Sequence, residues 1–185
     1  MAALFYINST MVSILDPLRN NAGGIKKSAN WYRSAVSSIA DRVTANKLMS
    51  KGKLIGRPSI GRLNMFFYDP KYKKTLPYYD TFPLVLPLER IPGGFSGINF
   101  HYLPPLARFR LLEQLQRYAV KGKQVDKTNS FDVSYNRVKG ISLTKNTIKK
   151  YLWKHVKSNF LRIEFDEAAL AIYLPVQQFK KGSPY

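Results

Sequence analysis

Positive charge is distributed unevenly along this chain, and this distribution restricts how the chain can fold. Residues 1–62 carry a net charge of +8, residues 63–132 carry +4 and residues 133–185 carry +7. Asp41 is the only acidic side chain in residues 18–61, and residues 134–162 contain none. Because local ion pairs cannot neutralise these two segments, we expect their cations to face something anionic.

The net charge of +19 restricts the class of partner. Such a charge steers polyanions toward a protein, and it is typical of proteins that contact nucleic acid. The same charge suits a basic component held in a larger assembly against acidic neighbours. No stretch approaches the length of a membrane span. We therefore predict DNA as a partner and no membrane.

Length and composition predict one folded core with an appendage, since 45% of the 185 residues are apolar. The absence of cysteine excludes disulfides, thiolate nucleophiles and thiolate zinc sites. His101 and His155 lie far apart in the sequence, so we interpret both as core histidines and predict neither metal nor cofactor. Residues 2–7 are too short for a signal peptide, which indicates a protein made and used in a cytoplasm.

Residues 1–60 are predicted to form a basic arm that becomes ordered on a partner. Residues 20–24 form a flexible break, and Ser28 can cap a short helix after it. Residues 50–58 have the small, basic and turn-rich composition of a linker. The apolar stripe of the helix consists of Trp31, Ala35, Ile39 and Val43. So narrow a stripe leaves an isolated helix only marginally stable. We therefore assign Trp31, Ile39 and Val43 to partner binding.

Residues 61–185 are predicted to form a single α+β domain, with a small mixed sheet and two or three packed helices. The predicted strands are residues 63–68, 84–86, 95–102 and 160–165, with residues 171–174 as a partner of the last. Proline on both sides of residues 84–86 confines that strand to a sheet edge or a strand end. Gly93 and Gly94 predict a turn before the third strand.

Two helices are predicted in this domain. Pro104 and Pro105 begin the first, because proline at the first helical position loses no hydrogen-bond donor that the helix needs. Its apolar stripe consists of Leu106, Phe109, Leu112, Leu115 and Ala119, and Arg108 lies away from it. Thr144 caps the second helix. The shared apolar face of this second helix consists of Ile148, Tyr151, Leu152, His155 and Val156.

One segment is compatible with catalysis. Asp69-Pro70-Lys71 has the spacing of an acid and a lysine in metal-dependent nucleases. Asp80 and Glu89 are the carboxylates close enough in sequence to complete a cation site. A turn with proline at its second position explains the same residues without chemistry. We therefore predict a protein that is not an enzyme, with a metal-dependent nuclease as a minor alternative.

Cations are interleaved with aromatic rings, a pairing that sequence-tolerant single-strand binders use, although the sequence leaves duplex and single-stranded contact both open. Residues 30–33, 71–74 and 149–154 each combine a cation with a ring that can stack on an unpaired base. For Tyr151 we prefer a core position. The residues assigned to nucleic-acid binding are Lys26, Lys27, Arg33, Lys51, Lys53, Arg57, Lys71, Lys73, Lys74, Lys145, Lys149, Lys154 and Lys157.

Three longer motifs carry a resemblance to a known family. They are GRLNMFFYDPK at residues 61–71, LPYYDTFPLV at residues 76–85 and GINFHYLPP at residues 97–105. Together they resemble the DNA end protector, or head-completion, family of T-even-like contractile-tailed phages. The likeness continues weakly to residue 179, and residues 1–60 carry none that we can assign.

The resemblance implies a virion protein that sits near the head–tail junction and shields the ends of packaged DNA from host exonuclease. The partners it implies are proteins of the neck, portal or tail, together with DNA bound without sequence preference. The protein would reside in the virion, and in the host cytoplasm during assembly. The alternative is a tail or baseplate component whose basic arm binds neighbouring subunits. The family supplies no catalytic or DNA-binding motif, so the assigned cations rest on charge and position.

Overall fold

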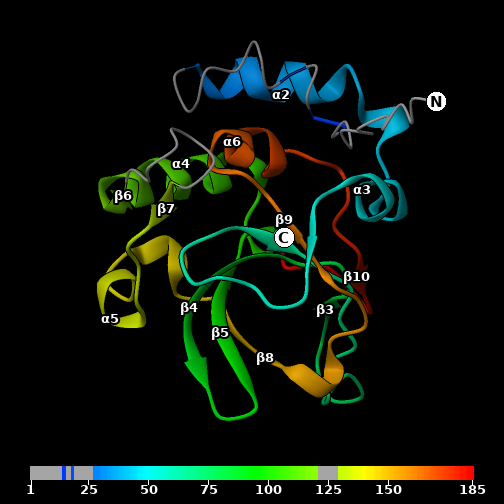
Figure 1. Cartoon of the computed structure of the whole chain (residues 1–185), viewed down its shortest axis with the longest axis vertical. Coiled ribbons are helices and arrows are strands. Elements are labelled where there is room, and N and C mark those ends of the chain that lie inside the picture. The colour runs from blue at the N-terminus through cyan, green and yellow to red at the C-terminus, as the bar shows by residue number, and fades with distance from the viewer. Residues whose placement is uncertain (1–13, 16–17, 19–26, 121–128) are drawn as a thin grey trace, which may run out of the picture.

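The computed structural model describes residues 14–15, 18, 27–120 and 129–185. Over these ranges the chain forms a six-stranded sheet in the order β1-β9-β2-β4-β5-β8, accompanied by two small two-stranded sheets. Helices gather toward one end of the molecule and the β4–β5 hairpin extends toward the other (Figure 1). The predicted α+β class is confirmed, and every described strand pair is antiparallel.

The large sheet consists of β1 (Leu54–Ile55), β2 (Asn64–Met65), β4 (Leu84–Ile91), β5 (Gly94–Asn99), β8 (Ile148–Leu152) and β9 (Phe160–Arg162). The small sheets pair β3 (Tyr79–Asp80) with β10 (Phe179–Lys180), and β6 (Ala119–Val120) with β7 (Ser130–Phe131). The α-helices are α2 (Ala29–Ser37), α3 (Ala45–Lys51), α4 (Pro105–Leu115), α5 (Tyr135–Val138) and α6 (Ala168–Ala171). The 3₁₀ helices are η1 (Ala40–Arg42), η2 (Phe100–Tyr102), η3 (Gln116–Tyr118), η4 (Ser142–Thr144), η5 (Trp153–His155) and η6 (Phe165–Glu167).

Strand β4 lies inside the sheet, between β2 and β5, so of the two predicted positions the sheet edge is wrong. Pro83 does lie at a strand end, directly before Leu84, whereas Pro87 lies within the strand. The strand continues through Pro87, where its register with β5 shifts before Glu89 in a bulge. A bulge interrupts the ladder, and it can therefore accommodate a residue without an N–H donor. The Pro87 carbonyl accepts a hydrogen bond from outside the β4–β5 pair, from the Gly61 N–H at 3.0 Å. Gly93 has a φ of 75° in the hairpin turn, which confirms the predicted turn.

Residues 144–157 form a strand with flanking 3₁₀ helices, where sequence analysis predicted a helix. Strand β8 pairs antiparallel with β5, and this pairing satisfies backbone groups that a helix would have satisfied locally. Apolar residues at three- and four-residue spacing in a short run do not distinguish a helix from a buried strand. Residues 171–174 were also predicted wrongly, because they continue from α6 instead of forming a strand.

Apolar side chains pack on both faces of the large sheet. On one face Leu84, Leu86 and Ile98 join the helices in the main core. The other face carries a mainly aromatic cluster of Phe66, Tyr68, Val85, Phe95, Tyr151 and Phe160. The Phe66 ring lies 4.7 Å from the Phe160 ring and 5.4 Å from the Tyr151 ring, measured between centroids. The core position predicted for Tyr151 is thereby confirmed, since only 4% of this residue is exposed.

Residues 29–55 pack against the rest of the described chain. Ser28 caps α2 by accepting a hydrogen bond from the Trp31 N–H, as predicted. Tyr32 is fully buried, and its ring lies 5.9 Å from that of Phe109 on α4. Strand β1 adds to the edge of the sheet beside β9. The predicted division of the chain at residue 60 stays a prediction.

None of the helices in the described ranges is long and apolar enough to cross a membrane.

Candidate nucleic-acid interface

Most of the cations assigned to nucleic-acid binding lie on the protein surface. Lys26 lies outside the described residues, and Lys149 is partly buried. The exposed members are Lys27, Arg33, Lys51, Lys53, Arg57, Lys71, Lys73, Lys74, Lys145, Lys154 and Lys157. The assigned cations that the structure describes are therefore accessible to an anionic partner. Lys149 is the least exposed of them.

Chain segments distant in sequence bring several of these cations together. The loop of residues 69–78 lies beside the segment that follows β8, because the Asp69 N–H donates to the His155 carbonyl at 3.0 Å. The Arg57 guanidinium lies over the Trp153 ring at 4.8 Å from its centroid. Helix α2, which carries Arg33 and directly follows Lys27 and Ser28, lies at the opposite end of the long axis from β8 (Figure 1). The fold therefore gathers the middle and C-terminal cations and leaves those of α2 apart.

A cavity of about 620 Å³ opens between the loop of residues 70–78 and β8. Its aromatic lining consists of Tyr68, Tyr72, Tyr78, Tyr79, Tyr102 and Tyr151. Its basic lining consists of Lys71, Lys149 and Lys150. Sequence reasoning assigned two of these lysines to nucleic-acid binding but did not assign Lys150, Tyr78, Tyr79 or Tyr102. We call this site the tyrosine–lysine pocket.

Two of the three pocket lysines lie against aromatic rings, and none of the three forms an ion pair with a described carboxylate. Lys149 Nζ is 4.2 Å from the centroid of Tyr102, and Lys71 Nζ is 4.9 Å from that of Tyr72. Among the described residues, none of the ion pairs involves Lys71, Lys149 or Lys150. Burial lowers the pKa of Lys149, because it penalises the charged form. An anion entering the pocket would compensate this desolvation.

The hydroxyl groups of Tyr68 and Tyr102 in the pocket stay protonated at physiological pH. Burial, followed by the nearby Asp80, raises the pKa of Tyr102 to about 12. Burial also raises the pKa of Tyr68, whose hydroxyl accepts a hydrogen bond from the Leu152 N–H at 3.1 Å. Tyr72 differs from these residues, because 62% of it is exposed. The pocket therefore offers buried phenols, one exposed ring, three lysines and the carboxylate of Asp80.

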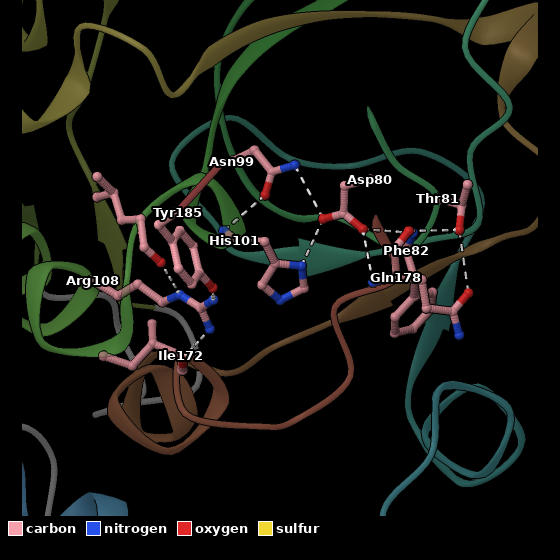
Figure 2. A network of polar contacts seen from close by, with 10 residues as sticks. Asp80, Thr81, Phe82, Asn99, His101, Arg108, Ile172, Gln178 and Tyr185 are labelled. Atoms are coloured by element: carbon pink, nitrogen blue, oxygen red, sulfur yellow. Dashed lines mark hydrogen bonds and ion pairs between the residues drawn. The ribbon is translucent and has the colours of Figure 1, made fainter. Parts of the chain in front are cut away.

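Asp80 and Asn99 line the pocket and belong to a buried polar network (Figure 2). Asp80 Oδ2 lies 2.7 Å from His101 Nδ1 and accepts a hydrogen bond from Asn99 Nδ2 at 3.3 Å. Asp80 Oδ1 accepts hydrogen bonds from the backbone N–H groups of Phe82 and Gln178. These contacts connect β3, β5 and η2 with the residue preceding β10. The core interpretation of His101 is confirmed, since this residue is fully buried.

Asp80 stays ionised in spite of its burial. Burial by itself raises the pKa of this carboxyl, but His101 and the two backbone donors outweigh that effect. The pKa of Asp80 therefore lies below its ordinary value of 3.8. The sequence alone gives little sign of this network, because its members lie on separate segments.

Arg108 is buried, although sequence analysis predicted that it lies away from the apolar stripe of its helix. Only 1% of this residue is exposed. Its guanidinium donates to the Leu103 carbonyl at 2.7 Å, to the Ile172 carbonyl at 2.8 Å and to the Tyr185 hydroxyl at 2.7 Å (Figure 2). A buried cation is tolerated where its donors are satisfied in this way. Leu106 of the predicted stripe is instead 54% exposed.

The carboxylates considered for a nuclease lie in different environments. Asp69 forms an ion pair with Lys73 at 2.8 Å on the surface, whereas Asp80 lies in the buried network. The proline turn begins one residue later than predicted, since the Lys73 N–H donates to the Pro70 carbonyl. Within the described part of the chain, no cluster of three or more metal-ligating side chains is present. The structure therefore does not bring Asp69 and Asp80 together as ligands of one cation.

The side chains assigned to partner binding lie in or against the protein's own core. Ile39 is 9% exposed and Val43 is 5% exposed, and both belong to the main core. Trp31 is partly buried, and its ring meets that of Tyr32 edge-on at 5.2 Å. Of the three side chains, Trp31 is therefore the one that presents part of its surface outward.

The arrangement of charge defines the class of protein. An excess of exposed cations over acids, with three lysines in a cavity lined by tyrosines, characterises a basic protein suited to a polyanion. Residues 2–185 match the family described as phage T4 terminal DNA protecting protein. The chain belongs to this family of phage proteins that protect DNA ends, which confirms the resemblance found in the sequence. The match also includes residues 2–60, where the sequence motifs gave no resemblance. The chain matches no curated protein and no solved structure.

Proposed function

We propose that this protein binds the ends of linear DNA through its exposed cations and shields them in the phage particle without catalysing a reaction. One observation carries the proposal: Lys71, Lys149 and Lys150 line the tyrosine–lysine pocket, and these lysines have no ion-pair partners among the described carboxylates. Membership of the family supports DNA ends as the target.

The physical basis of binding is the release of counterions from DNA phosphates. Each phosphate contact contributes about −0.9 to the slope of log affinity against log salt concentration. Lysines contact phosphates without reading bases, so we expect no sequence preference. Exposed cations also supply the long-range attraction that brings DNA to the protein.

Salt-dependent binding tests this proposal. The protein should bind a short linear duplex at low salt, lose affinity steeply at moderate salt and slow the attack of an added exonuclease. Replacing both Lys74 and Lys154 by Gln should reduce the magnitude of the salt slope by about 2, because two phosphate contacts are removed. The matched control replaces Lys47 and Lys139, which are exposed but were not assigned to DNA binding. Absence of binding at low ionic strength would remove DNA as a partner.

A second measurement tests the proposed absence of catalysis. Asp69 pairs with Lys73, and Lys73 lowers the pKa of Asp69, which supports a structural role for this carboxylate in the turn. Asp69→Asn should therefore leave DNA binding and end protection unchanged. Cleavage of DNA by the wild type with added Mg²⁺ or Mn²⁺, abolished by this substitution, would establish the nuclease alternative instead.

We also propose a location at the head–tail junction, with proteins of the neck, portal or tail as partners. Membership of a phage family that protects DNA ends supports this location, since the end of the packaged genome lies near the portal. Locating the chain in a density map of the intact particle tests it. A position in the tail or baseplate, with an acidic neighbour along the basic N-terminal segment, would favour the structural alternative.

A further inference from the structure

We propose that the tyrosine–lysine pocket holds one unpaired nucleotide at the terminus of a DNA strand. This inference rests on the proposed function, because it assigns part of the binding to the strand end itself. A volume of about 620 Å³ lies within the range of roughly 300–1,000 Å³ typical of small-ligand sites. A single nucleotide is a ligand of this size class, whereas a duplex is too wide to enter.

The chemistry of the lining matches the two parts of a nucleotide. Tyrosine rings stack on bases, and such stacking tolerates every base because each has a π face. The exposed ring of Tyr72 and the ring of Tyr78 belong to the loop, and Tyr102 of η2 lies beside Tyr78. The Tyr78 and Tyr102 rings are 5.8 Å apart at an interplanar angle of 43°. These rings form an aromatic wall to which a base can add.

The lysines supply the complement to the phosphate. Lys149 is partly buried over the Tyr102 ring, and Lys71 lies over the Tyr72 ring. Lys150 extends the basic lining along β8. Within the described ranges no carboxylate forms an ion pair with these ammonium groups. Asp80 also lines the pocket, but its oxygens are engaged by His101, Asn99 and two backbone N–H groups. A partly desolvated cation gains more from a phosphate than a fully hydrated one does, because the surrounding dielectric is lower.

The pocket is held in shape by contacts within the chain. Lys181 Nζ donates to the carbonyls of Lys74 and Leu76 at 2.8 and 3.0 Å, which fixes the loop against the C-terminal segment. The Asp80 network fixes the opposite wall by joining β3 to Asn99 at the end of β5. A site preorganised in this way loses little conformational entropy when a ligand enters.

Only an unpaired nucleotide can use such a pocket. A base inside a duplex is already stacked on both faces and paired along its edge, so exposing it costs stacking and pairing energy. At a single-stranded end this cost is absent. The pocket therefore provides a reason for the protein to prefer DNA ends to the interior of a duplex, which the basic surface alone does not.

The test compares two DNA hairpins with duplex stems of equal length. In the closed hairpin, a loop joins the strands at each end of the stem, so no strand terminus is exposed. The overhang hairpin has one open end, with a short single-stranded overhang that carries a fluorescent purine analogue at its terminal position. The wild-type protein should bind the overhang more tightly and should change the fluorescence of the terminal base. Tyr72→Ala should weaken binding to the overhang about tenfold, the effect expected from losing one stacking contact, and should leave binding to the closed hairpin unchanged. Tyr72 is largely exposed, so this variant should fold normally.

Matched variants and a second ligand sharpen the comparison. Tyr135→Ala removes another exposed tyrosine, on α5, which lies on the opposite side of the molecule from β3 (Figure 1), and it should change neither affinity. Lys150→Gln should weaken overhang binding more than Lys139→Gln does. A free deoxynucleoside monophosphate should compete only weakly with the overhang. Competition at equal concentration would indicate a site for free nucleotides and would overturn the assignment to strand ends.

The outcomes separate this inference from the proposed function. Equal affinity for the two hairpins would overturn the assignment of the pocket to a terminal nucleotide and would leave the proposed DNA binding intact. A Tyr72→Ala protein that binds the overhang like the wild type would do the same. Failure of the wild type to bind either hairpin at low salt would overturn both.

Discussion

At the scale of single residues, Asp80 connects the stability of the fold to the shape of the candidate site. Its carboxylate is buried, and it receives contacts from β5, from η2 and from the residue before β10. Because its pKa lies below the ordinary value of 3.8, the folded protein holds this group ionised more strongly than the unfolded chain does. Its contribution to stability is therefore present above that value and is lost as the pH falls through the lower pKa of the folded state.

Asp80→Asn should destabilise the protein by about 1–3 kcal/mol at neutral pH, because an amide NH₂ replaces a buried oxygen that accepts from Asn99 and contacts His101. Urea unfolding at several pH values measures this loss. The wild type should lose stability as the pH falls below about 4, and the variant should show a smaller change over the same interval. A variant with the wild-type pH dependence would show that Asp80 does not supply it.

At the scale of elements, β8 decides where the candidate site lies. This strand is the edge of the described sheet, and it places Lys149 and Lys150 beside the loop of residues 70–78. Cations on an edge strand also discourage pairing with a strand of another molecule. The strand approaches β5 closely at Gly94, where a methyl group would collide with the Tyr151 carbonyl. A glycine at this position therefore permits the pairing on which the pocket depends.

Gly94→Ala should move β8 away from β5, destabilise the protein by about 1–3 kcal/mol and weaken binding to single-stranded ends. The destabilisation follows from overpacking against backbone atoms, which cannot rotate away as a side chain can. Thermal unfolding and binding to the overhang hairpin measure the two effects. Gly140→Ala is the matched control, because a methyl group at Gly140 would meet no atom within 4 Å. Equal melting temperatures for the two variants would contradict the close approach.

At the scale of the whole molecule, the packing of α2 and α3 bears on which residue begins the folded unit. Tyr32, Val36 and Leu48 are buried in the main core together with side chains of α4 and α6. Burial of this extent predicts that residues 29–55 fold with the rest of the chain. The arm predicted from the sequence would instead become ordered only on a partner.

Tyr32→Ala distinguishes these two expectations. If α2 belongs to the folded unit, the substitution should destabilise the free protein by about 3–5 kcal/mol, as removal of a buried aromatic ring does elsewhere. Tyr135→Ala, at an exposed position, should have little effect. Limited proteolysis of the free wild type should then spare residues 29–55. An unchanged melting temperature, with rapid cleavage before residue 58, would support the partner-dependent arm with its boundary at residue 60.

The sequence by itself determined those features that depend on neighbouring residues or on composition. The Ser28 cap, the proline start of α4 and the turn at Gly93 are local, because each depends on hydrogen bonds or backbone angles within a few residues. The exposure of most assigned cations follows from the cost of burying charge. The family motifs were equally visible, since they are contiguous runs of residues.

Only the tertiary structure decided the features that depend on distant partners. The segment 148–152 became a strand because β5 offers an edge to pair with, and Arg108 was buried because carbonyls of Leu103 and Ile172 receive its donors. The tyrosine–lysine pocket combines four separate segments, so no local pattern could predict it. Strand pairing, burial and cavity formation depend on contacts between segments that are distant in the sequence. A local pattern of neighbouring residues does not specify those contacts.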